Sequence, residues 1–138
     1  MPYAQLDDGA RLYYELTGPA EAPVIVQFGG GLFGRHNFGL VNDGFRERFR
    51  LLSFDARGYG ASSTPRERYT IEGWAADGAA LLDAVGLERA YVHGTSMGGM
   101  IAIVFAGKYP QRTASVVINC AAAKLGRSGR VPGRVRGP

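Results

Sequence analysis

A serine between glycines, placed where one apolar segment gives way to another, restricts the fold of this chain more than any other feature. AYVHG (90–94) predicts a short buried strand, and MGGMIAIVFAGKY (97–109) is apolar nearly all round until Pro110, as in a helix sandwiched in a core. Between them, GTSMG (94–98) satisfies the pattern G-x-S-x-G. A strand that turns into a helix at this pattern indicates that Ser96 is a nucleophile on a sharp turn.

The same turn accounts for the small residues around the serine. Such a serine takes strained backbone angles, and its neighbours must be small where the helix packs against adjacent strands, hence Gly94, Gly98 and Gly99. The turn lifts the Ser96 hydroxyl clear of the sheet and aims the first N–H groups of the helix, that of Met97 foremost, at a developing oxyanion. The alternative is a helix whose N-cap happens to be serine; the strand before it and the helix after it favour the nucleophile.

Other apolar segments predict that strands and helices alternate along the chain. Thr70 is placed to cap a helix that Gly86 ends, and residues 38–49 carry apolar side chains at helical spacing. Apolar, β-branched strands joined by helices indicate an α/β fold with a mostly parallel sheet and helices on both faces. The predicted strands are RLYYEL (11–16), PVIVQF (23–28), RLLSFD (50–55), AYVHG (90–94) and SVVINC (115–120).

Charge and composition argue against several classes of partner. The chain has 138 residues and a net charge of +4, but five basic residues lie from Lys124 onward, so residues 1–123 hold 11 basic and 12 acidic side chains. The 124–138 segment has few apolar groups and is predicted to be a basic, disordered tail, so no nucleic-acid partner is expected. No window is apolar enough for a membrane helix and no leader is recognisable, which predicts no membrane partner and a cytoplasmic location. Cys120 is the only cysteine, so we expect no internal disulfide.

A second glycine pattern points to a different function. GGGLFG (29–34) satisfies G-x-G-x-x-G after a predicted strand, and Asp55 ends another strand about 20 residues further on. In this alternative, Gly29, Gly31 and Gly34 let a pyrophosphate approach the backbone, and Asp55 accepts hydrogen bonds from a ribose. The chain would then be a dinucleotide-binding Rossmann-type module.

Three segments, in order along the chain, resemble the α/β-hydrolase family over most of residues 10–123. PVIVQFGGGLFG (23–34) is similar to the third strand and oxyanion loop of that family, and FDARGYGAS (54–62) to the turn after its fourth strand. The stretch that starts with GTSMGGM (94–122) is similar to the nucleophile elbow, its helix and the next strand. Three ordered motifs favour the hydrolase over the dinucleotide-binding module.

The resemblance implies a serine hydrolase that cleaves a small-molecule ester or lactone through an acyl-enzyme, without a metal or cofactor. It assigns Ser96 as the nucleophile. It assigns the backbone N–H groups of Met97, and of Gly30 or Gly31, as donors to the oxyanion. The glycines that mimic a dinucleotide loop lie where the family places its second oxyanion donor.

The resemblance also changes the expected role of the turn after the fourth strand. It places Asp55, Arg57 and Gly58 in a stabilising turn rather than in a catalytic site. We expect Asp55 and Arg57 to form a local charge-assisted network there.

The sequence does not supply the groups that would activate the serine. The family order is serine, then acid, then histidine, but residues 97–138 contain no Asp, Glu or His. His93, in the incoming strand, is expected to be structural. His36 follows the oxyanion loop and could reach the pocket, but it is not favoured as the base because no acidic partner orients it. We therefore expect residues 1–123 to be the N-terminal part of an α/β-hydrolase domain, truncated after about the sixth strand, and the chain alone to be inactive.

Overall fold

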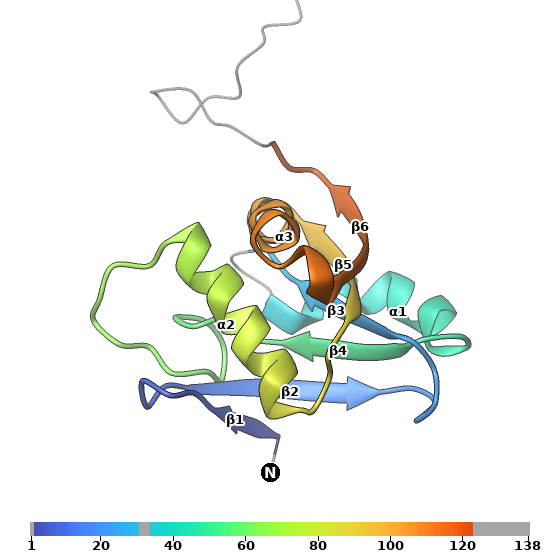
Figure 1. Cartoon of the computed structure of the whole chain (residues 1–138), viewed down its shortest axis with the longest axis horizontal. Coiled ribbons are helices and arrows are strands. Elements are labelled where there is room, and N and C mark those ends of the chain that lie inside the picture. The colour runs from blue at the N-terminus through green and yellow to red at the C-terminus, as the bar shows by residue number, and fades with distance from the viewer. Residues whose placement is uncertain (1, 31–33, 123–138) are drawn as a thin grey trace, which may run out of the picture.

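The computed structural model describes residues 2–30 and 34–122, which form one six-stranded sheet flanked by helices (Figure 1). Gly31 and the predicted 124–138 tail lie outside the described residues. The strands are β1 (Tyr3–Gln5), β2 (Arg11–Thr17), β3 (Val24–Phe28), β4 (Arg50–Phe54), β5 (Ala90–Thr95) and β6 (Thr113–Asn119). The helices are α1 (Gly39–Arg46), α2 (Ile71–Ala84) and α3 (Met97–Lys108), with short 3-10 helices η1 (Gly34–Phe38) and η2 (Pro110–Arg112).

The strands follow the order β1-β2-β4-β3-β5-β6 across the sheet. β4, β3, β5 and β6 run parallel to one another, whereas β2 is antiparallel to β4 and β1 is antiparallel to β2. The predicted α/β fold with a mostly parallel sheet is therefore confirmed, and every predicted strand is present near its expected position. β1 was not predicted, because three residues are too few to show a pattern.

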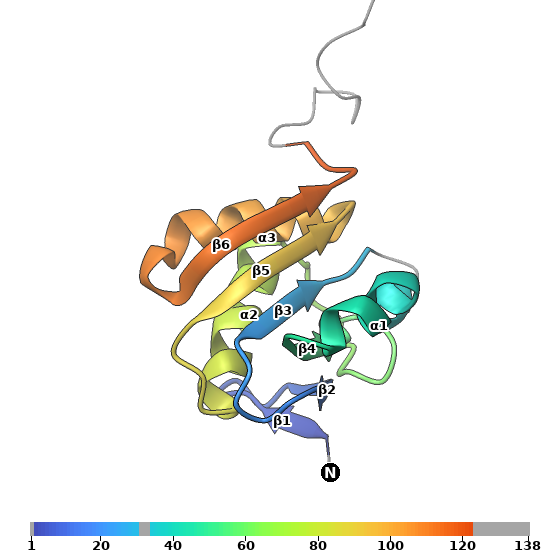
Figure 2. The ribbon, with the colours of Figure 1, turned by 90° about the vertical axis from the view of Figure 1, so that its right-hand side faces the viewer.

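β3 lies in the sheet between two layers of helices, with α1 on one face and α2 and α3 on the other (Figure 2). Phe28 packs against Phe105 of α3 with ring centroids 5.6 Å apart, on the face covered by α2 and α3. Gln27 points to the other face, where its Nε2 donates a 2.7 Å hydrogen bond to Oδ1 of Asn42 in α1. All five residues of β3 are buried, as expected for a strand covered on both sides.

The two longer helices begin and end at the signals that the sequence contains. The Thr70 hydroxyl caps α2 by accepting a 2.9 Å hydrogen bond from the N–H of Gly73, and Gly86, with a φ of 73°, follows the last turn. α3 contacts α2, β5 and β6, which explains its all-round apolar character, and it ends before Pro110. Among the described residues, no helix has the length and apolar character needed to cross a bilayer.

The parallel strands all end at the same edge of the sheet. This arrangement brings together the segments that follow β3, β4 and β5, which start with Gly29, Asp55 and Ser96. In open α/β sheets, ligands bind outside the carboxyl ends of the strands. The candidate site therefore lies at this edge.

Candidate active site

Ser96 occupies the sharp turn between β5 and α3. Its φ of 55° and ψ of −123° lie in a region that residues other than glycine rarely adopt. Strain of this kind costs about 1–3 kcal/mol and persists only where the surrounding structure holds it. Here the Ser96 N–H donates to the Asn119 carbonyl at 3.0 Å, and the Ser96 carbonyl accepts from the Gly99 N–H at 2.9 Å. Ser96 itself is exposed at the sheet edge.

Close backbone contacts require glycine on both sides of this turn. A Cβ atom at Gly94 would lie 2.3 Å from the carbonyl oxygen of Gly98, and one at Gly98 would lie 1.9 Å from that of Phe28. A Cβ atom at Gly99 would lie 2.4 Å from the Cβ of Ala121. These separations leave no room for a side chain at the three positions. The predicted need for small residues around Ser96 is therefore confirmed.

Two of the predicted oxyanion donors lie next to Ser96. Met97 is the first residue of α3, so its N–H belongs to the turn whose N–H groups are not used inside the helix. Gly30 is buried, and a Cβ atom there would lie 3.5 Å from the Cβ of Ser96. Gly31, the alternative donor, lies outside the described residues. The geometry of Gly30, Ser96 and Met97 is compatible with a site that holds a developing negative charge.

A small cavity adjoins these residues. It lies between Gly30 and Met97 and has a volume of about 10 Å³, enough for about one water-sized group. Its walls are mostly apolar, and they include Phe28, Phe54, Tyr59 and Ile101.

Asp55 is a buried residue whose ionic partner differs from the expected one. It is 1% exposed, and its carboxylate accepts hydrogen bonds from the backbone N–H groups of Arg35 (3.2 Å) and Ala61 (2.9 Å). It also forms an ion pair with the Arg35 guanidinium. The predicted Asp55–Arg57 network is therefore wrong, because Arg57 turns to other acidic residues. The dinucleotide alternative loses its ribose acceptor, because this carboxylate is buried and already paired.

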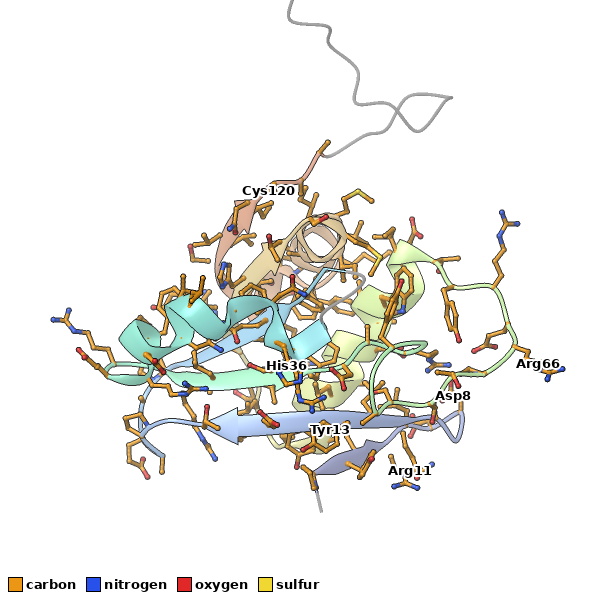
Figure 3. All side chains as sticks on the ribbon, turned by 180° about the vertical axis from the view of Figure 1, so that it is seen from behind. Asp8, Arg11, Tyr13, His36, Arg66 and Cys120 are labelled. Carbon is orange, nitrogen blue, oxygen red and sulfur yellow. The ribbon has the colours of Figure 1, made fainter. Side chains whose placement is uncertain are left out.

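Arg57 stabilises the turn by joining it to three other segments. Its guanidinium makes two hydrogen bonds, of 2.8 and 2.9 Å, to Asp77 of α2 and a third, of 3.0 Å, to Glu67. It also reaches Asp8 at 2.5 Å. Asp8 lies in the turn between β1 and β2 (Figure 3). Burial disfavours the charge, but hydrogen bonds to Asp8 and Asp77 raise the pKa of Arg57 above its ordinary value. The turn-stabilising role expected of Arg57 is thus present with different partners.

His93 is buried on the α1 side of β5. Its ring lies 4.5 Å from that of Phe38 and 5.8 Å from that of Phe45, measured between centroids. Burial lowers the pKa of His93, and the 3.3 Å hydrogen bond between Nε2 and Asn119 Oδ1 opposes that shift. Its Nδ1 has no hydrogen-bond partner among the described residues. These surroundings are those of a structural histidine, as expected.

The 3-10 helix η1 holds two residues that sequence reasoning missed. Arg35 pairs with Asp55, and Asn37 Nδ2 donates a 3.2 Å hydrogen bond to the Gly30 carbonyl. His36, between them, is exposed (Figure 3). An isolated arginine and asparagine after a glycine loop form no motif, so no sequence signal marked them.

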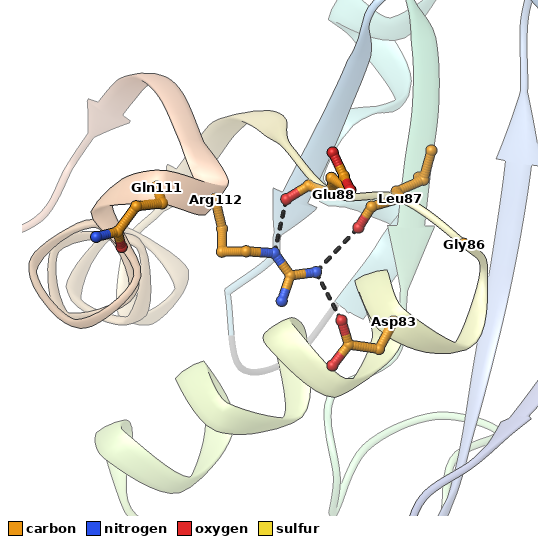
Figure 4. Close-up of a pocket in the computed structure, with 6 residues that line it drawn as sticks. All are labelled: Asp83, Gly86, Leu87, Glu88, Gln111 and Arg112. Atoms are coloured by element: carbon orange, nitrogen blue, oxygen red, sulfur yellow. Dashed lines mark hydrogen bonds and ion pairs between the residues drawn. The ribbon is translucent and has the colours of Figure 1, made fainter.

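A wider pocket lies at the opposite end of α3 (Figure 4). Unlike the cavity beside Met97, it is lined by several charged side chains. It has a volume of about 540 Å³, and Arg112 crosses it to donate hydrogen bonds to the carbonyls of Glu88 (2.6 Å) and Leu87 (2.9 Å) and to Asp83 (2.8 Å). These bonds tie the loop before β5 to the segment after α3. The described lining residues include no serine, cysteine or histidine, so we assign the pocket a structural role.

Comparison with known proteins identifies relatives of this chain. The family described as alpha/beta hydrolase fold matches residues 23–135. 3-Oxoadipate enol-lactonase 2 of Acinetobacter baylyi is 37% identical over 84 residues, which cover 61% of this chain. The bifunctional esterase/perhydrolase of Acinetobacter calcoaceticus is 30% identical over 118 residues, which cover 80%. The crystal structure of the enol-lactonase from Burkholderia xenovorans superposes with a TM-score of 0.86 at 31% identity over 91% of this chain.

The matches cover only part of each relative. The aligned regions account for 32% of the Acinetobacter baylyi enol-lactonase, 40% of the esterase/perhydrolase and 48% of the enol-lactonase crystal structure. The chain thus spans less than half of the length of these proteins.

Proposed function

The chain belongs to the α/β-hydrolase fold family, and from this membership we propose that it carries the nucleophile of a serine hydrolase that cleaves carboxylic esters or lactones. The proposal rests on the backbone of Ser96, with its φ of 55° and ψ of −123°. A serine that only caps a helix has extended backbone angles and accepts a hydrogen bond from the helix through its side chain. Ser96 has neither feature, since its side chain makes no capping hydrogen bond. Its strain therefore supports exposure of a reactive hydroxyl rather than helix capping.

In the proposed reaction, the Ser96 Oγ attacks the carbonyl carbon of the ester, its proton passes to a base, and the carbonyl oxygen becomes an oxyanion. The N–H of Met97, and that of Gly30 or Gly31, donate to this oxyanion. When the intermediate collapses, the carbon–oxygen bond to the alcohol breaks and the alcohol takes the proton from the base. Water then attacks the acyl-enzyme in the same way and releases the carboxylic acid and the free serine.

The proton acceptor in this proposal lies outside the nucleophile segment. Residues 97–138 contain no His, Asp or Glu, and His93 is buried on the α1 side of its strand. A serine hydroxyl without a base is a weak nucleophile. We therefore propose that the 138-residue chain alone does not turn over esters, and that activity requires a polypeptide segment that supplies a histidine and an acid.

The proposed substrate is a small ester or lactone. The cavity between Gly30 and Met97 is mostly apolar and has room for a group of about the size of a methyl or a water molecule. The relatives named enol-lactonase and esterase point to the same type of bond. Serine rather than aspartate at position 96 speaks against epoxide hydrolase chemistry, in which a carboxylate is the nucleophile. This mechanism requires no metal or cofactor.

Covalent labelling tests the proposed nucleophile without requiring turnover. The chain is incubated for hours with a fluorophosphonate, digested and analysed by mass spectrometry, with Ser96→Ala and Ser63→Ala treated in parallel. In a model triad enzyme that keeps its full pocket, the oxyanion hole and binding alone retain about 10³–10⁴-fold catalysis over water, so at most slow labelling of Ser96 is expected. The adduct should persist in Ser63→Ala and disappear in Ser96→Ala. Equal labelling of several serines, or none at Ser96, would contradict the proposal.

A further inference from the structure

Gly30 lies between the proposed nucleophile and the side chain of Asn37. A Cβ atom at Gly30 would lie 3.5 Å from the Cβ of Ser96 and 3.4 Å from Asn37 Oδ1. Gly30 is buried and Asn37 is half-buried, so neither has free room to move. The position of Gly30 relative to Ser96 therefore depends on the position of the Asn37 side chain.

Asn37 holds the Gly30 peptide group by its carbonyl. Its Nδ2 donates a 3.2 Å hydrogen bond to the Gly30 oxygen, which directs that oxygen toward η1. A carbonyl oxygen turned toward the nucleophile would repel a developing oxyanion, whereas one tied to an amide donor stays away from it. We infer that Asn37 is a positioning residue, which fixes the orientation of the Gly30 carbonyl and so keeps the loop beside Ser96 ready to stabilise negative charge.

The 3-10 helix η1, which carries Asn37, is anchored to the sheet at two points. On one side of Asn37, the Arg35 backbone and guanidinium bind Asp55 at the end of β4, and the guanidinium lies 4.3 Å from the centre of the Tyr13 ring on β2. On the other side, Phe38 is 3% exposed and packs against His93 of β5. These contacts tie η1 to three strands.

A rigid η1 makes the amide of Asn37 a fixed donor. A fixed donor loses little conformational entropy when it holds a backbone carbonyl, which is how supporting residues keep a reactive site in its productive geometry. Asn37 therefore acts on the site by orienting Gly30. This role requires no contact between Asn37 and the substrate.

Carbonyl NMR of the labelled chain tests this inference directly. Asn37→Asp keeps the side-chain shape but removes the donor, and Asn37→Ala removes the whole amide. Leu40→Ala is the control, because Leu40 is 102% exposed on the adjoining helix α1. The Gly30 ¹³C carbonyl resonance is expected to move and broaden in both Asn37 variants and to stay unchanged in Leu40→Ala. An unchanged Gly30 resonance in either folded Asn37 variant would overturn the inference.

A second measurement connects the orientation to the reaction, and this part rests on the proposed function. The rate of fluorophosphonate labelling at Ser96 should fall about tenfold in Asn37→Asp relative to Leu40→Ala, because a misdirected loop loses part of its oxyanion stabilisation. A rate equal to that of Leu40→Ala would show that the hydrogen bond has no role in the site and would overturn the inference. If the unmodified chain is not labelled at Ser96, the proposed function fails, and the Gly30 resonance still decides the role of Asn37.

Discussion

A Cβ atom at position 98 would lie 1.9 Å from the carbonyl oxygen of Phe28, so Gly98 places the backbone of α3 in direct contact with the end of β3. Alanine at this position must push the two backbones apart. We expect Gly98→Ala to lower the free energy of unfolding by about 1–3 kcal/mol or more, as for other insertions into a packed core. Urea denaturation measures this change. Labelling of Ser96 should fall as well, because the displaced helix carries the turn.

Gly107 provides a matched control in the same helix. A Cβ atom there would meet nothing within 4 Å. Gly107→Ala should raise the free energy of unfolding by about 0.5–1 kcal/mol, because alanine loses less conformational freedom than glycine in a helix. Equal effects of Gly98→Ala and Gly107→Ala would contradict the steric explanation.

Arg57 should stabilise the fold mainly through its buried partner Asp77 rather than through its exposed partners. Its side chain is 13% exposed and that of Asp77 is 10% exposed, whereas Asp8 and Glu67 are more than half exposed. Arg57→Met leaves the Asp77 carboxylate buried without its partner, and we expect a loss of about 3 kcal/mol in urea denaturation. Glu67→Gln should cost less than about 1 kcal/mol, because exposed ion pairs contribute little. A loss from Glu67→Gln as large as that from Arg57→Met would show that the surface pairs matter equally.

The turn at Ser96 and the order of strands and helices could be predicted because their signals are local. Gly94, Gly98 and Gly99 stand within one short pattern around Ser96, so the sequence shows them, although the contacts that require Gly98 and Gly99 come from Phe28 and Ala121. The Thr70 cap and the Gly86 stop likewise involve only neighbouring residues. Periodicity and local signals were enough to place these elements.

The polar contacts behind the site could not be predicted, because each joins residues far apart in the chain. Arg35 and Asp55 are 20 positions apart, and no sequence pattern links the two residues. On the α1 face of the sheet, Ser53 donates to Gln27 at 2.6 Å, and Gln27 donates to Asn42. In the sequence, Ser53 and Gln27 are single polar residues within apolar runs, and only the strand register shows that they meet.

His93 should make stability depend on pH. Burial lowers the pKa of His93 in the folded chain from its ordinary value of 6.5, so the unfolded chain binds the proton more readily. The stabilising contribution is complete above pH 6.5 and is lost as the pH falls below that value, by at most about 1.4 kcal/mol per pH unit for one proton. Urea denaturation between about pH 7.5 and 5 should show this loss, and His93→Gln should reduce it. His36→Gln is the control, and an equal reduction in that variant would contradict the assignment to His93.

The isolated 138-residue chain should not turn over p-nitrophenyl acetate faster than its Ser96→Ala variant. Ser96 can present a hydroxyl and lies beside candidate oxyanion donors, but no His, Asp or Glu follows it within residues 97–138. Release of p-nitrophenol is followed by absorbance at equal protein concentrations. A burst that depends on Ser96 would show that a base is already present in this chain.

β6 should make the isolated chain associate. Among the described residues it pairs with β5 alone, it contains no charged side chain, and Val117 is 61% exposed on it. An uncharged strand edge with apolar side chains offers free backbone groups to another molecule, so we expect light scattering to report masses above that of a monomer. Val117→Lys should reduce this association, because charge on an edge strand opposes pairing. Leu40→Lys introduces the same charge at an exposed apolar residue of α1 and should not reduce it. A monomeric parent chain at high concentration, or equal effects of the two lysines, would contradict association through β6.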